Sequence, residues 1–274
     1  MIRTHRRHAS ADGVNAHGRR RIGYFSKRWP GLALVSLLAA FSVWASTPPA
    51  VASESLPVNL SPEGWTRIAE DGGIVLLVQT PEGQRQPAYR ARGVLKASIG
   101  QILEVLHDNA TAAEWMPDLA LQEVLDQPSA FERVTRSVYA VPFPFADREL
   151  VLHSRLFLDR SGRDLVADAV SVDHPRAPPV RGRVRARMVC SRTRLHPLGP
   201  NRTAIDFLML VDPRGQIPDF LATFGLRQAP MKFVKALEAR ARTAGYPVRP
   251  DYRAMLWQLR GLDTRPHGGN RWPK

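Results

Sequence analysis

Residues 211–218 read Val-Asp-Pro-Arg-Gly-Gln-Ile-Pro, and this stretch joins a strand-like run to a helical pattern. The apolar run from Thr203 to Val211 predicts the strand. After it, apolar residues recur at the spacing of one helix face: Ile217, Phe220, Leu221 and Phe224, then Met231, Val234 and Leu237. Pro218 suits the first turn of this helix, whereas Pro230 predicts a kink or an interruption within it. The sequence therefore predicts a final strand followed by one long helix.

Upstream, the chain alternates between strand-like runs and turn signals such as Asp71-Gly72-Gly73. The predicted strands are 65–70, 74–80, 88–97, 121–126, 131–141, 148–158, 164–172, 184–195 and 203–211. Between the third and fourth strands, Ser98 can cap a helix over 99–107, which resumes near 111–115. This order of elements predicts an α+β fold.

Nine strands are too many for a flat open sheet, so we expect a curved antiparallel sheet wrapped around the long C-terminal helix. The side chains of one helix cannot fill the whole concave side of such a sheet. The remaining space is expected to be apolar and enclosed, and spaces of this kind bind ligands.

The N-terminal segment, residues 1–52, has the organisation of an export signal. A basic region ends at Arg28, an apolar run of about 14 residues follows, and Ala50-Val51-Ala52 supplies small residues for cleavage. The run is shorter than the roughly 20 residues of a spanning helix. These features predict a bacterial-type signal peptide cleaved after Ala52 and a periplasmic or secreted protein, with an uncleaved membrane anchor as the alternative. The remaining chain divides into a ligand-binding domain over 53–245 and a C-terminal tail over 246–274.

The net charge of +14 suggests a nucleic-acid binder, but its distribution argues against one. Residues 1–52 hold eight Arg or Lys and one acid, so half of the net positive charge lies in this N-terminal segment. The body shows no zinc-finger spacing and no basic helix. Arg181, Arg183, Arg185 and Arg187 alternate, which predicts a solvated sheet face that could attract an anionic membrane. No nucleic-acid partner is expected.

Motifs for catalysis and metal binding are missing from the sequence. It contains no G-x-S-x-G nucleophile elbow, no H-E-x-x-H and no phosphate-binding loop. Four histidines of the body are scattered, namely His107, His153, His174 and His196. With one cysteine, Cys190, an intramolecular disulfide is impossible. We therefore expect neither catalytic residues nor a metal site.

Several segments together carry a family resemblance. Pro142–Glu149 reads Pro-Phe-Pro-Phe-Ala-Asp-Arg-Glu and resembles the "P-W-P-x-x-D-R-D" segment of START domains, the lipid-transfer domains related to steroidogenic acute regulatory protein. Residues 211–218 resemble their "D-P-G-G-x-I-P" segment, with Arg214 in place of a glycine. Val180–Arg187 resembles the "V-R" strand of the family. The resemblance covers roughly residues 60–245.

The resemblance implies a helix-grip fold around an apolar tunnel that holds one lipid and no cofactor. Its lid would be the C-terminal helix and the loop Asp173–Gly182. The implied lipid-binding residues are Ile217, Phe220, Leu221, Phe224, Arg148, Pro178, Pro179 and Val180. For the helix residues the alternative is core packing, and for Arg148 it is an ion pair with Asp147 or Glu149. Pro178 to Val180 either contact the bilayer or form a rigid turn.

Some sterol-binding members place a buried acid and a buried arginine in the tunnel, where this chain has Thr135 and Ser154. That substitution argues against cholesterol as the ligand. Three functions remain open. The first is a monomeric carrier of a lipid or other hydrophobic molecule with transient membrane contact. The second is an enzyme of the wider helix-grip superfamily such as a cyclase or hydrolase, and the third is a basic protein that binds a membrane surface.

Overall fold

The computed structural model describes residues 56–243, 245 and 247–259, and for residues 219–222 and 224 it describes the backbone alone. The predicted signal peptide and its cleavage site lie outside the described residues, as does the end of the predicted tail. Within the described part, none of the helices has both the length and the apolar character needed to cross a membrane.

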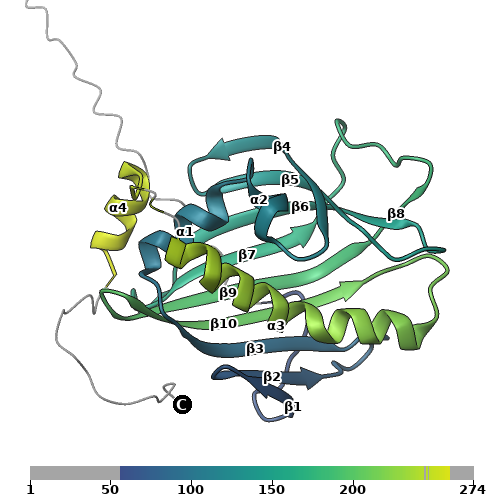
Figure 1. Ribbon diagram of the computed structural model, residues 1–274, viewed down its shortest axis with the longest axis horizontal. Coiled ribbons are helices and arrows are strands. Elements are labelled where there is room, and N and C mark those ends of the chain that lie inside the picture. Colours follow the sequence, from purple (N-terminus) through teal and green to yellow (C-terminus); the bar gives the residue numbers. More distant parts are fainter. Residues whose placement is uncertain (1–55, 244, 246, 260–274) are drawn as a thin grey trace, which may run out of the picture. The chain divides into compact units, whose positions relative to one another are not determined.

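One curved antiparallel sheet forms most of the fold (Figure 1). Its strands are β1 (Thr66–Asp71), β2 (Ile74–Gln79), β3 (Ala88–Leu95), β4 (Leu119–Ser129), β5 (Glu132–Tyr139), β6 (Asp147–Leu158), β7 (Leu165–Ser171), β8 (Arg183–Arg185), β9 (Arg187–Gly199) and β10 (Arg202–Asp212). Nine of these follow the order β1-β2-β3-β10-β9-β7-β6-β5-β4, and the short β8 pairs in parallel with β6. The predicted helix-grip class and its sheet of about nine strands are confirmed.

The long helix α3 (Asp219–Thr243) covers part of one face of the sheet, which we call the inner face (Figure 1). It lies over β2, β3 and β10 and beside α1 (Ile99–His107) and α2 (Ala112–Trp115). Val234 and Leu237 of α3 are fully buried in the main core. Burying side chains of this size contributes about 1.5–3 kcal/mol each, so these contacts fix the helix on the sheet.

Local signals in the sequence predicted most boundaries. Ser98 caps the beginning of helix α1. Its side chain accepts a hydrogen bond from the Gln101 backbone N–H, and the Gln101 side chain accepts one from the Ser98 backbone N–H. Of the two outcomes predicted for Pro230, the interruption is wrong: helix α3 runs through this proline, with a bend about midway along its length (Figure 1). Packing against the sheet on both sides of the proline holds the helix together. The predicted strand 184–195 is also two strands, β8 and β9, separated by Ala186.

The opposite, outer face of the sheet is covered in part by the segment 56–65, which we call the strap. Leu56, Val58, Leu60 and Trp65 of the strap pack against a small cluster on β3, β9 and β10. This cluster includes Cys190, which is buried as expected for a small apolar side chain. With α3 on one face and the strap on the other, the interior of β10 is buried from Thr203 to Val211.

The C-terminal segment after residue 245 contributes to the core of the domain. Helix α4 (Pro250–Trp257) packs beside α1, and Tyr252 and Leu259 belong to the main core. Arg249 binds Glu104 of α1 through its backbone N–H at 2.7 Å and through its side chain. The predicted tail 246–274 therefore begins with a structural part of the domain.

Candidate functional site

The inner face divides into a closed part and an open part. Under α3, the Phe207 and Phe233 rings lie 4.6 Å apart, and the Tyr89 hydroxyl donates to the Thr223 carbonyl. Further along the sheet, Leu150 and Leu165 are buried, but six other inner residues of β6 and β7 are only half-buried. These are Leu152, Ser154, Leu156, Ala167, Ala169 and Ser171. Because α3 packs on β2, β3 and β10, this part of the inner face is less covered than the part under the helix, and we call it the open part of the inner wall.

The inner wall of β5 is polar but uncharged in its middle. Thr135 and Ser137 are buried, and the Ser137 hydroxyl donates to Gln122 at 3.4 Å. Next to them, the Tyr139 hydroxyl donates to Met116 Sδ at 3.5 Å, and burial raises the pKa of this tyrosine to about 12. Thr135 and Ser154 therefore face the interior as neutral hydroxyl groups.

Arg148 is buried, but it pairs with neither Asp147 nor Glu149. Its guanidinium donates to three backbone carbonyls: Ala146 at 2.5 Å, Pro213 at 3.2 Å and Arg214 at 3.0 Å. The last two belong to the loop that leads into α3. Arg148 thus holds the beginning of the long helix against the end of the sheet, and the ion pair that the sequence favoured is wrong.

The predicted acid partner of Arg148 has partners of its own on the outer face. Glu149 accepts from Arg136 at 2.6 Å and from Arg185 at 2.7 Å, and it also pairs with Arg183. Burial raises the pKa of this carboxyl, but the hydrogen bonds from these arginines outweigh burial and leave the pKa below its usual value. Two of the four alternating arginines are therefore structural ligands of a buried acid and not merely a solvated row.

The loop Asp173–Gly182 contacts the outer face. Its one buried apolar residue, Ala177, packs against Val134 and Val151, and the Ala177 carbonyl accepts from Arg185. Pro178, Pro179 and Val180 are exposed. No contact described for this part of the chain brings them to the inner wall, so their predicted role in lipid binding stays a prediction.

The remaining predicted site residues lie at the start of α3. Ile217 is half-buried in the loop before the helix. Phe220, Leu221 and Phe224 lie in α3, but their side chains are outside the described part of the structure. Their contribution to a tunnel wall is a prediction that rests on the helical spacing.

A pocket of about 60 Å³ lies at the other end of the inner face, between α1, the β4–β5 hairpin, β6, β7 and α4. Its polar residues include Arg133, Ser154 and Tyr252. Neither Arg133 nor Tyr252 lies in a motif that the sequence marks as functional. The alternation of β5 could have indicated Arg133, which shares a face with Thr135, whereas Tyr252 arrives from a helix assigned to the tail.

His107 connects this pocket to α4. Its Nδ1 lies 2.6 Å from the Tyr252 hydroxyl, and its Nε2 lies 2.6 Å from Nη1 of Arg249. Burial, followed by the charges of Arg133 and Arg249, lowers the pKa of His107 to about 4. The ring is therefore neutral at neutral pH, and this uncharged histidine, close to Arg133 and Arg249, helps to hold α4.

This arrangement makes the stability of the domain depend on pH. An unfolded histidine has a pKa near 6.5, so between about pH 6.5 and pH 4 the unfolded chain takes up a proton that the folded chain does not. The contribution of His107 is complete above this window and is lost as the pH falls through it. Urea unfolding of wild type and His107→Gln should show a free-energy difference that shrinks from pH 7 to pH 4. Equal pH dependence in the two proteins would contradict the assignment.

Comparison with known proteins gives one consistent family. The sequence profile of the START domain matches residues 50–244. An uncharacterised protein of Pseudomonas aeruginosa is 24% identical over 183 residues, covering 67% of this chain and 89% of that protein. The phosphatidylcholine transfer protein of Rattus norvegicus is 24% identical over 174 residues, covering 62% and 80%.

Two solved structures share the fold. The STAR-related lipid transfer protein from Xanthomonas axonopodis has a TM-score of 0.59 and 26% identity, covering 66% of this chain and 100% of that structure. Human StAR-related lipid transfer protein 5 has a TM-score of 0.61 and 17% identity, covering 66% and 88%. With a profile match across most of the chain and the same sheet and long helix, this protein belongs to the START domain family.

Proposed function

We propose that this protein is a non-enzymatic, monomeric carrier that binds a lipid or a similar hydrophobic molecule between α3 and the open part of the inner wall. Support comes from its family and from relatives named as lipid transfer proteins, including one from a bacterium. The proposal adds that the ligand lies along β6 and β7, where the fold leaves six inner side chains half-buried.

That half-burial is the observation on which the proposal depends. Ala167, Ala169 and Ser171 are small, and they stand in a row on the inner face of a central strand. Small side chains widen the space between a sheet and the helix that crosses it. Each methylene that a ligand buries there gains about 0.8 kcal/mol, so a long acyl chain binds tightly without any charged contact.

A substitution that fills this space tests the proposal. Ala169→Phe puts a ring on the inner face, whereas Val170→Phe puts one on the outer face of the same strand. Mass spectrometry of organic extracts should find a stoichiometric lipid in wild type and in Val170→Phe, and at least severalfold less in Ala169→Phe. An empty wild-type protein that also fails to take up fluorescent lipids would refute ligand binding.

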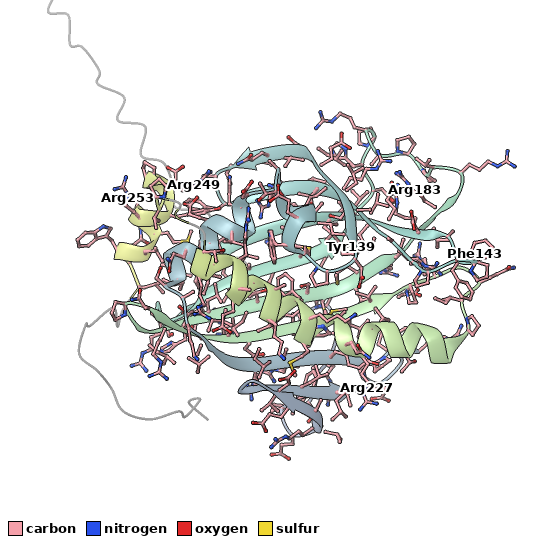
Figure 2. All side chains as sticks on the ribbon, viewed as in Figure 1. Tyr139, Phe143, Arg183, Arg227, Arg249 and Arg253 are labelled. Carbon is pink, nitrogen blue, oxygen red and sulfur yellow. The ribbon has the colours of Figure 1, made fainter. Side chains whose placement is uncertain are left out.

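We also propose that the protein contacts a membrane through the end of the sheet where α3 begins. Phe143 is 96% exposed there, on the loop between β5 and β6, and Val180 is 40% exposed (Figure 2). An exposed aromatic ring beside the arginines of β8 suits a bilayer with anionic lipids. Contact at this end would bring the membrane close to the helix that must move for a ligand to enter.

Transfer assays can separate membrane contact from ligand binding. Phe143→Ala should slow lipid transfer between anionic vesicles severalfold, because the variant loses an apolar membrane contact, while its ligand affinity stays unchanged. Trp257→Ala is the matched control, since Trp257 is 84% exposed and belongs to α4, which lies toward the opposite end of the sheet (Figure 1). Equal transfer by wild type and Phe143→Ala would rule out this contact.

Residues 1–52 support a further part of the proposal, that the carrier works outside the cytoplasmic membrane. Expression of the full chain in a bacterium should yield a periplasmic or secreted protein. Its amino-terminal sequence should begin at Ser53, after the Ala50-Val51-Ala52 site. A membrane-bound product that retains residues 1–52 would favour the uncleaved anchor instead.

A further inference from the structure

Arg133 is a partly buried cation at the far end of the inner wall. Its Nη2 donates to the Leu106 carbonyl at 2.6 Å and its Nη1 to the His107 carbonyl at 3.3 Å. These bonds cap the carboxyl end of α1, where a helix favours positive charge. Among the ion pairs of the described residues, none joins Arg133 to a carboxylate. A guanidinium has five N–H donors, so several remain for a ligand in the adjoining pocket.

The hydroxyl of Tyr252 is a second donor toward the same pocket. Arginine can only donate, so Arg249 donates to Nε2 of His107 and the neutral ring carries its hydrogen on Nδ1. That hydrogen is donated to the Tyr252 oxygen, 2.6 Å away. The hydrogen of the tyrosine hydroxyl is thereby left to point at an acceptor in the pocket. The Ser154 hydroxyl, directly across from Arg133 on β6, supplies another donor.

The charges around the pocket favour an anion. Arg133 lines it from the inner face, whereas Glu132 and Arg155 are partners across β5 and β6 on the outer face, where Glu132 is bound to His153 at 2.5 Å. Arg249 and Glu104, which hold α4 in place, pair with one another. The groups that face the pocket therefore carry a positive excess next to three hydrogen-bond donors.

Size and surroundings narrow the class of anion. A pocket of about 60 Å³ accommodates a group of a few atoms such as a carboxylate. A carboxylate is planar and accepts two parallel hydrogen bonds from a guanidinium. The neighbouring wall is apolar at Leu106, Leu156 and Ala167, and it continues along β6 and β7 into the open part of the inner face.

We propose that this pocket binds the carboxylate of a long-chain fatty acid through Arg133, Tyr252 and Ser154, with the acyl chain lying along β6 and β7. The proposal rests on the proposed function, because it assigns the polar end of the ligand in the same interior. It also gives α4 a role, since Tyr252 closes the pocket from a helix that lies beyond the matched family segment.

Two ligands that differ in one group test this subsite. Purified wild-type protein is titrated with hexadecanoate and with hexadecanol at a pH where the acid is ionised. The acid should bind at least about tenfold more tightly, because charge-assisted hydrogen bonds add to the same chain burial. Arg133→Gln should bind the two ligands equally, and Tyr252→Phe should show a reduced preference. Arg163→Gln, which removes an exposed arginine in the β6–β7 turn, should keep the wild-type preference.

The outcomes separate the two proposals. Equal binding of acid and alcohol by wild type, or a preference that persists in Arg133→Gln, overturns the carboxylate subsite and leaves lipid binding intact. Failure of wild type to bind either ligand overturns the proposed function as well. Should Arg133→Gln fail to fold because α1 loses its cap, the wild-type comparison and Tyr252→Phe still decide the matter.

Discussion

The packing of α3 against β3 and β10 is the constraint on which the rest of the structure depends. Val234 and Leu237 anchor the helix there, and Phe233 meets Phe207 across the interface. A helix with its side chains is about 10–12 Å wide. Strands spaced about 4.8 Å apart make a sheet of this size on the order of 40 Å across before it curves. The helix therefore closes one part of the inner face and leaves the strands beyond it uncovered.

Much of the fold could be predicted because its signals are local. Alternation marked the strands, Ser98 marked the start of α1, and the spacing from Ile217 to Leu237 marked α3. Pro230 shows the limit of such signals. A proline predicts a break from the hydrogen bond it removes, but the break was outweighed by apolar contacts that the helix makes with distant strands.

The candidate site was harder to predict because its contacts join segments far apart in the chain. Arg148 could be recognised as a buried cation, yet two of its three partners are carbonyls 65 and 66 residues away, and none is an adjacent acid. Arg133 and Tyr252 meet because α4 folds back onto α1, and nothing in the composition of 246–259 separates that helix from a solvated tail. The loop at Ala177 likewise found its place on the outer face through contacts that no local pattern encodes.

The strap has a consequence for how the domain can be attached to anything else. Because Leu56, Val58 and Leu60 lie on the outer face, the chain enters the fold on the side of the sheet away from α3 and the open inner wall. A tether, a tag or a membrane anchor joined ahead of the strap would thus connect to the back of the domain. Attached in this way, the domain would keep α3 and the open inner wall away from the point of attachment.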